Sequence, residues 1–180
     1  MSTTARGTTR GLRRWESVHP WVYGSDVAER PSAEAGVVEV RDSRNRRLGL
    51  ALWSPRSEIS LRFVDSDADA VIDREWWRAR IGAALARRAG LDTVTNAYRV
   101  VHGEADGLPS LVVDRYDRWA VIQVMSAGLA RFQTEIVDAV VEVLRVDGVL
   151  ARNDVALRAK EGLARETIAL HGDVPREIEV

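Results

Sequence analysis

The sequence of 180 residues contains no cysteine. This absence excludes disulfide bonds, thiolate metal ligands and any mechanism that uses a cysteine nucleophile within the chain. No apolar run approaches the roughly 20 residues that span a bilayer, so a membrane partner is not expected. The arginines near the N-terminus are not followed by the apolar core of a secretory signal. We therefore expect a cytoplasmic protein.

Charge is nearly balanced over the whole chain but unevenly distributed along it. The 26 basic and 27 acidic residues give a net charge of −1, which differs from the strongly basic character of many nucleic-acid-binding proteins. Residues 1–64 nevertheless hold 11 arginines and 7 acidic residues, and Lys160 is the only lysine of the chain. Arginine suits contacts with phosphates and base edges, although a GC-rich genome also produces an arginine bias.

Turn signals and apolar runs divide the chain into three parts. Residues 1–11 are mainly Ser, Thr, Gly and Arg with little to bury, and they are expected to form a disordered arm. Residues 12–70 alternate short apolar runs with turns, which predicts a small β-rich unit. Its strand candidates are 37–40, 47–53 and 59–64, with a hairpin turn at 42–46 and an acidic linker at 65–72.

Residues 71–180 predict an α+β unit with two main helices. The first helix is expected after Asp73 as N-cap and to run to about Ala89, with Gly90 as a stop. The second is expected over 130–145, where apolar residues recur at helical spacing. The strand candidates are 97–102, 109–114, 118–125, 148–152 and 166–171. The fold class is therefore α+β with two domains.

Residues 103–116, GEADGLPSLVVDRY, are the most informative stretch. Asp106-Gly107 supplies turn chemistry, and residues 111–113 form a short buried-strand pattern. The stretch resembles the signature G-E-x-D-G-L-P-G-L-[IV]-V-D-R-Y of a family of bacterial class I S-adenosylmethionine (SAM)-dependent ribosomal RNA methyltransferases. That family methylates carbon 5 of a cytosine in the large-subunit (23S) RNA. Ser110 stands where the family usually has glycine.

Further motifs extend this resemblance from about residue 12 to the end of the chain. Each is weak alone, but they occur in the expected order and spacing. They are HPWVY at 19–23, WSPRSEISLR at 53–62, YRVVH at 98–102, and RND at 152–154 followed by Arg158 and EGL at 161–163.

The resemblance implies that residues 12–70 form a PUA domain, a compact RNA-binding β-barrel, and that 71–180 form the family's central domain. It also implies a third, Rossmann-like domain with the cofactor site and a catalytic cysteine, which we expect to be absent from this chain. No glycine-rich G-x-G-x-G or G-x-G-x-x-G turn occurs here, and such a turn lets backbone approach a cofactor closely. We expect no cofactor in this chain and SAM in the complete family enzyme.

The candidate RNA-binding residues lie in the basic first third. Guanidinium groups can contact phosphates, and an imidazole ring can stack on a base. For Trp21 and Tyr23 burial in the barrel is the alternative, and a solvated turn is the alternative for the hairpin tip. The candidates are Arg13, Arg14, His19, Arg44, Arg46 and Arg47.

The hairpin around Asp106 is a second candidate site, which the resemblance places near the active-site cleft of a complete enzyme. Glu104 and Arg115 are expected to pair across it, with one of the hairpin residues, Glu104, Asp106 or Arg115, contacting substrate. Alternating residues of one strand share a face, so His102, Glu104, Asp106 and Asp114 also raise the hypothesis of a small metal-dependent enzyme.

Two more polar sets allow structural explanations. Arg152, Asp154, Arg158 and Glu161 are spaced for a salt-bridge network around a turn, with an RNA contact by Arg158 as the alternative. Arg62 could extend the basic surface, but its motif is better explained by a turn at Ser54-Pro55.

The expected function is binding and positioning of large-subunit ribosomal RNA for methylation, without catalysis by this chain alone. A stand-alone PUA-type RNA-binding or adaptor protein is the main alternative. A homodimer and a separately encoded catalytic domain stay open as further partners.

Overall fold

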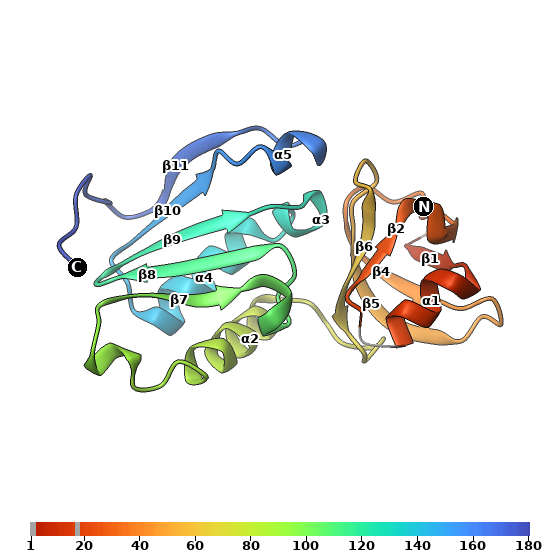
Figure 1. Cartoon of the computed structure of the whole chain (residues 1–180), viewed down its shortest axis with the longest axis horizontal. Helices are drawn as coiled ribbons and strands as arrows, with labels where there is room; N and C mark the ends of the chain where they lie inside the picture. Colours follow the sequence, from red (N-terminus) through yellow and green to blue (C-terminus); the bar gives the residue numbers. More distant parts are fainter. Residues whose placement is uncertain (1–2, 17–18) are drawn as a thin grey trace.

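Two domains lie side by side along the long axis of the molecule, and each is built on its own β-sheet (Figure 1). The computed structural model describes residues 3–16 and 19–180, and the side chains of Arg14 and Glu16 lie outside the described set. The two-domain α+β fold predicted from the sequence is confirmed.

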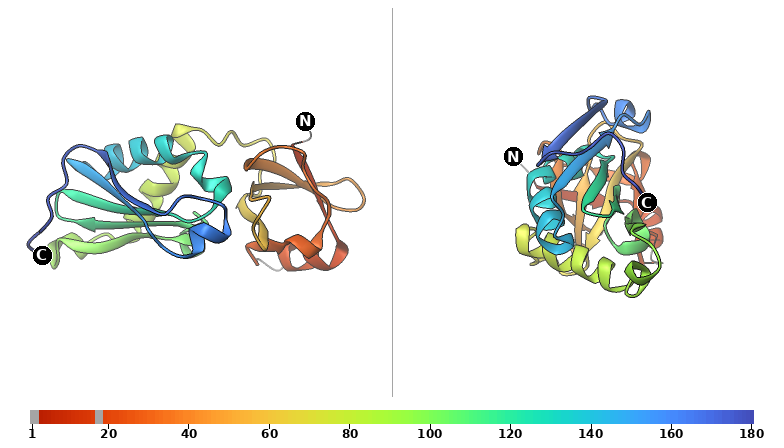
Figure 2. Two further views of the ribbon diagram at one scale, coloured as in Figure 1. Left: turned by 90° about the horizontal axis from the view of Figure 1, so that it is seen from above. Right: turned by 90° about the vertical axis from the view of Figure 1, so that its left-hand side faces the viewer.

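The N-terminal domain is a six-stranded sheet with the order β2-β6-β5-β4-β1-β3, which curls into a barrel (Figure 2). Alternate residues of its strands point inward, so that Val38 and Val40 of β4 are buried. They pack with Trp53 and Leu61 in the barrel core. The elements are β1 (Thr4–Gly7), α1 (Thr9–Glu16), β2 (Trp21–Tyr23), a 3-10 turn η1 (Gly24–Asp26), β3 (Val27–Glu29), β4 (Gly36–Arg41), β5 (Arg47–Trp53) and β6 (Ile59–Asp65).

The predicted disordered arm over residues 1–11 is wrong for the described residues from 3 onward. Thr4–Gly7 form β1, which pairs in parallel with β4 and antiparallel with β3. Ala5 is fully buried in the barrel core. The segment has few apolar residues, so its order comes from backbone hydrogen bonds to two neighbouring strands, which composition does not reveal.

The central domain is a five-stranded sheet with the order β11-β10-β9-β8-β7. Only β9 and β10 pair in parallel, and α3 and α4 connect them. The helices α2 and α4 cover one face of the sheet (Figure 2). The elements are α2 (Arg74–Ala86), η2 (Leu91–Thr93), β7 (Ala97–His102), η3 (Gly103–Asp106), β8 (Leu111–Tyr116), β9 (Trp119–Val124), α3 (Ala127–Ala130), α4 (Gln133–Leu144), β10 (Gly148–Asn153), α5 (Leu157–Lys160) and β11 (Glu166–His171).

The two main helices lie where their apolar spacing predicted them. The Asp73 carboxylate caps α2 by accepting a hydrogen bond from the amide of Trp76. The helix ends at Ala86, three residues before the predicted end, and Gly90 instead takes a left-handed conformation before η2. Trp77 and Ile81 of α2 are fully buried under the sheet.

The two domains share apolar and polar contacts at their junction. Leu52 and Val64 of the barrel belong to the apolar core of the central domain. Arg47 of β5 pairs with Asp69 of the linker and donates to the Ala68 carbonyl, both at 2.7 Å. Asp65, at the end of β6, accepts hydrogen bonds from the Trp76 indole and from an Arg80 guanidinium nitrogen of α2. These contacts fix the connection between the domains.

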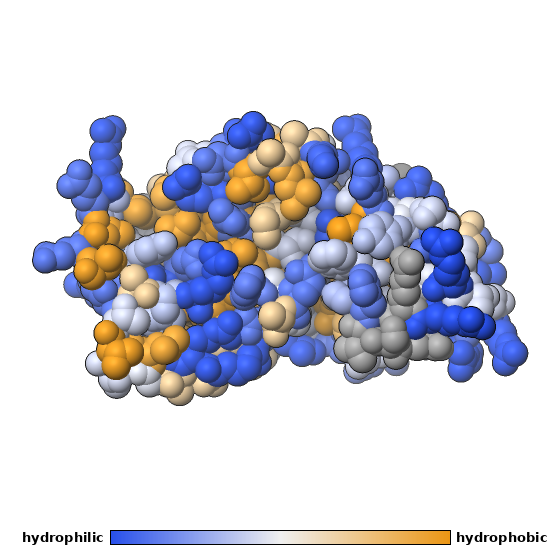
Figure 3. Space-filling model, in the orientation of Figure 1, coloured by the Kyte–Doolittle hydropathy of each residue, from blue (hydrophilic) through white to orange (hydrophobic). Residues whose placement is uncertain are grey.

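On the face shown in Figure 3 the barrel is mainly hydrophilic, whereas apolar side chains gather in small patches over the central domain. Among the described residues, none of the helices is both long and apolar enough to cross a bilayer. Within residues 3–16 and 19–180, the large apolar side chains with the greatest exposure all lie at or beyond position 71, and they are Val71, Leu91, Val94, Leu157, Ile168 and Val180.

Candidate nucleic-acid interface

The basic hairpin between β4 and β5 is largely neutralised by its own acidic residues. Asp42 accepts hydrogen bonds from the backbone amides of Arg44 and Arg46, both at 2.8 Å, and from the Arg46 guanidinium at 2.6 Å. The bond from Arg46 is the largest cause of a lowered Asp42 pKa. Arg47 pairs with Glu39 at 2.6 Å in addition to Asp69. Arg44 alone of these arginines makes no ion pair within the described residues, so it remains available for a phosphate.

Helix α1 and the segment after it supply the second group of candidates. Arg13 is exposed and has no ion-pair partner among the described residues, while the side chain of Arg14 lies outside them. His19 is exposed and packs edge-on against Trp21, with ring centroids 5.8 Å apart. Trp21 and Tyr23 are half-buried, and the residue between them, Val22, fills the barrel core. The expected burial of Trp21 and Tyr23 in the barrel is therefore only partly confirmed.

The loop formed by η3 is anchored by Asp106. Its carboxylate accepts hydrogen bonds from Arg88 at 2.6 and 2.7 Å, from Arg87 at 2.8 Å and from the backbone amide of His102 at 2.7 Å. Burial acts to raise the pKa of Asp106, but the bonds from Arg88, His102 and Arg87 outweigh it and lower the pKa to about 2. Asp106 is thus a structural anion, and it holds the loop against α2.

The predicted pair between Glu104 and Arg115 is not formed. Glu104 instead accepts a hydrogen bond from the indole of Trp21, with Nε1 and Oε1 separated by 2.8 Å. Arg115 donates to the carbonyl of Asp117 at 2.9 Å, at the far end of β8. The sequence could not reveal the contact with Trp21, because the two residues belong to different domains and are 83 positions apart.

The contact between Trp21 and Glu104 lies at a pocket of about 640 Å³ between the domains. The barrel contributes one wall and the η3 loop the other, and the lining is mostly apolar. The rings of Trp15 and Phe63 pack edge to face in the barrel wall, with centroids 4.9 Å apart. Beside these two rings the wall residues are His19, Pro20, Leu48 and Ser66 from the barrel side and Glu104, Ala105, Gly107 and Pro109 from the loop side.

A metal site on the face from His102 to Asp114 is not supported. No group of three or more potential ligands comes together among residues 3–16 and 19–180. Asp114 is held by a bidentate pair with Arg99 at 2.7 and 3.0 Å, and Asp106 is held by two arginines. Both carboxylates are therefore engaged by guanidinium groups.

A buried ion pair connects the domains at another point. Arg62 of β6 donates to Glu161 at 2.9 Å, and their side chains are only 4% and 1% exposed. Glu161 also accepts from the Ser57 hydroxyl at 2.5 Å and from the backbone amide of Ala127 at 3.1 Å. Nearby, the backbone amide of Gly128 donates to the Ser54 hydroxyl at 3.2 Å. Two of the sequence motifs, at 53–62 and 161–163, thus meet in one polar cluster at the domain junction.

The predicted network around Arg152 is split between two places. Arg152 pairs with Asp154 on the surface at 3.2 Å. The buried guanidinium of Arg158 donates to the carbonyls of Val124 and Ala164, so it is not free to contact RNA. Glu161 pairs with Arg62 in the other domain instead.

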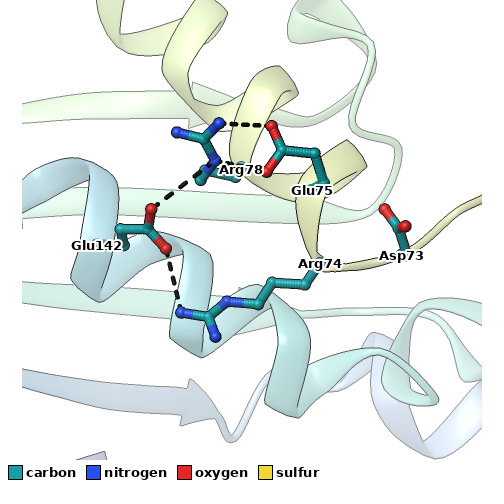
Figure 4. A pocket seen from close by; sticks show the side chains of 5 residues that line it. All are labelled: Asp73, Arg74, Glu75, Arg78 and Glu142. Atoms are coloured by element: carbon teal, nitrogen blue, oxygen red, sulfur yellow. Dashed lines mark hydrogen bonds and ion pairs between the residues drawn. The ribbon is translucent and has the colours of Figure 1, made fainter.

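An open hollow on the helical layer is a network of ion pairs rather than a binding site. Glu142 of α4 accepts from Arg74 at 3.1 Å and lies 3.8 Å from Arg78, which also pairs with Glu75 at 2.5 Å (Figure 4). The side chains face one another across α2 and α4 and satisfy their own charges. Such exposed pairs stabilise a protein by only about 0–1 kcal/mol.

Comparison with known proteins agrees with this division of the chain. Residues 8–66 match a family model described as a PUA-like domain. The N-terminal domain is PUA-like. The chain is 39% identical over 175 residues to ribosomal RNA large subunit methyltransferase I of Alteromonas mediterranea, covering 95% of the chain and 43% of that relative. The protein of the same name from Photobacterium profundum is 38% identical over 180 residues, covering 94% of the chain and 43% of the relative.

A solved structure has the same fold over nearly the whole chain. It is a protein of Streptococcus mutans described provisionally as a SAM-dependent methyltransferase, with a TM-score of 0.80 and 15% identity. The match covers 98% of this chain and 45% of that one. The chain therefore spans less than half the length of the curated relatives and of the solved structure that it matches.

The β9–α3 turn leaves no open space for SAM. The sheet connection that most resembles a nucleotide-binding turn runs from β9 into α3, but a Cβ atom at Gly128 would lie 2.8 Å from the Trp53 carbonyl oxygen. This glycine therefore permits close packing of α3 on the barrel and leaves no room there for a ligand. The prediction that this chain holds no cofactor stays a prediction.

Proposed function

We propose that this chain binds large-subunit ribosomal RNA and positions it for methyl transfer from SAM to carbon 5 of a cytosine. The observation that carries the proposal is the 39% identity over 95% of the chain to a ribosomal RNA large subunit methyltransferase. The PUA-like match over residues 8–66 supports RNA binding by the barrel.

In this proposal the reacting groups belong to residues outside this chain. Carbon-5 methylation of cytosine requires a thiolate that attacks the ring, and the sequence has no cysteine. The β9–α3 turn, where a cofactor would need open space, is packed against the barrel. In this proposal the described residues bind the RNA and fix the orientation of the RNA.

Salt-dependent RNA binding tests this function. The purified chain should bind fragments of large-subunit ribosomal RNA, and the logarithm of the association constant should fall linearly with the logarithm of the salt concentration. Arg13→Ala combined with Arg44→Ala removes two guanidinium groups that have no ion-pair partner among the described residues. Each lost phosphate contact should reduce the slope by roughly 0.7–0.9.

Arg74→Ala is the matched control, because Arg74 is exposed but paired with Glu142 on the helical layer. It should leave both the affinity and the slope unchanged. Absence of RNA binding at low salt would overturn the proposed function, and an equal effect of the control variant would remove Arg13 and Arg44 from the interface.

A further inference from the structure

The pocket between the barrel and the η3 loop combines an apolar lining with one carboxylate acceptor. Its volume of about 640 Å³ lies within the range of small-molecule sites, roughly 300–1,000 Å³. Its walls are aromatic and apolar. Among the described residues that line it, Glu104 is the one with a charged side chain. A phosphate would be repelled by this carboxylate, so a ligand of the pocket must be largely apolar and must donate hydrogen bonds.

The Glu104 carboxylate is oriented for such a ligand. Its Oε1 atom accepts from the Trp21 indole at 2.8 Å, which holds the side chain in one orientation. Its second oxygen has no partner among the described residues. The loop that presents Glu104 is itself held by Asp106, with hydrogen bonds from Arg87, Arg88 and the His102 amide. The acceptor is therefore preorganised before a ligand arrives.

An unstacked nucleobase with an exocyclic amino group has the matching chemistry. RNA sequence is read mainly from single-stranded bases that stack on aromatic rings and donate or accept on their base edges. Trp15, Phe63 and His19 supply rings, and a carboxylate accepts from the N4 amino group of cytosine. Uracil has no exocyclic amino group and presents a carbonyl oxygen at the same position, which the Glu104 carboxylate repels.

We propose that this junction pocket binds one unstacked, amino-bearing RNA base, with Glu104 as the hydrogen-bond acceptor that rejects uracil. The inference rests on the proposed RNA-binding function and deepens it. It assigns base selection to a site that needs both domains, whereas phosphate contacts belong to the barrel arginines.

Binding of two hexaribonucleotides, oligo(C) and oligo(U), to the whole chain tests the proposal. At low salt the wild type should bind oligo(C) about tenfold more tightly than oligo(U), because one base-edge contact discriminates by roughly 1–3 kcal/mol. Glu104→Gln should abolish this preference. Since the Trp21 indole retains the amide oxygen as its acceptor, the amide NH₂ replaces the free oxygen and opposes the amino group of cytosine.

Two further variants separate base reading from general effects of charge and stacking. Glu142→Gln makes the same change of charge on the helical layer and should leave the preference for oligo(C) intact. Phe63→Leu should weaken both oligonucleotides about equally, since it removes an aromatic wall but not the acceptor. Protection of tryptophan fluorescence from an added quencher by oligo(C), but not by free phosphate, together with loss of this protection in Trp15→Phe, would place the base in the pocket.

The possible failures are distinct. Salt-dependent binding of both oligonucleotides with equal affinity, unchanged in Glu104→Gln and Phe63→Leu, would overturn the pocket proposal and leave RNA binding by the barrel in place. Absence of binding to the oligonucleotides and to ribosomal RNA fragments would overturn the proposed function and this inference together.

Discussion

The buried pair of Arg62 and Glu161 should be one of the most strongly coupled contacts between the domains. The two side chains are 4% and 1% exposed, and the carboxylate also accepts from Ser57 and from the amide of Ala127. Removal of one partner leaves the other charge buried without its counter-charge, which costs about 3–5 kcal/mol. For a chain of this size that corresponds to a fall of roughly 6–20 °C in the melting temperature.

A double-mutant cycle isolates this energy. Arg62→Met and Glu161→Leu each remove one charge at similar volume, and the double variant removes both. Each single variant should lose about 3–5 kcal/mol in urea unfolding, whereas the double variant should lose clearly less than the sum, because no charge remains buried. Limited proteolysis in the linker at 65–72 should accelerate in the single variants, since the domain junction is weakened.

The exposed pair of Glu75 and Arg78 provides the matched control, with side chains 67% and 44% exposed. Its cycle with Glu75→Leu and Arg78→Met should show a coupling of about 0.5 kcal/mol or less. Strict additivity of Arg62→Met and Glu161→Leu, or single losses as small as those of the control pair, would refute the assignment of this cluster as an interdomain lock.

Three further changes should produce measurable effects. The pKa of Asp106 is lowered to about 2. The ionised carboxylate therefore stabilises the fold by roughly 2 kcal/mol above about pH 4, and this stabilisation is lost as the pH falls from 4 to 2. Asp106→Asn should flatten that part of the curve of unfolding free energy against pH. Gly128→Ala should destabilise the chain by about 1–3 kcal/mol, because its Cβ would lie 2.8 Å from the Trp53 carbonyl oxygen; an unchanged urea midpoint would contradict this close approach. Ser110 has a φ of 65°, so Ser110→Gly should raise the unfolding free energy by about 0.5–1 kcal/mol, with thermal unfolding as the measurement.

Local patterns predicted most of the helices and strands. The apolar spacing around Trp77 and Ile81 gave the first main helix, and strands 97–102 and 47–53 begin and end where they were predicted. The turn around Asp106 was also recognised, and the left-handed φ of Ser110 explains why a glycine usually stands at that position in the resembling signature. These features depend on residues close together in the chain, where propensity and periodicity act.

The contacts between domains could not be predicted in the same way. Trp21 and Glu104 are 83 residues apart, and Arg62 and Glu161 are 99 residues apart. The sequence instead suggested partners nearby, such as Arg115 for Glu104 and Arg158 for Glu161. Likewise, the run of arginines at 44–47 indicated an available basic cluster, but Asp42, Glu39 and Asp69 compensate two of its three charges. The predicted RNA-binding roles of Arg13, Arg14, His19, Arg44, Arg46 and Arg47 stay predictions.

The connection from β6 to α2 restricts how the two domains can move relative to each other. Arg47 holds Ala68 and Asp69, while Trp76 and Arg80 hold Asp65, so the barrel is restrained from swivelling relative to the five-stranded sheet. Under the proposed function, two points on one RNA strand, one bound by the barrel and one at the junction pocket, would be kept at a constant spacing. Transcripts whose bends and bulges match that spacing would then contact both points at once, and others only one.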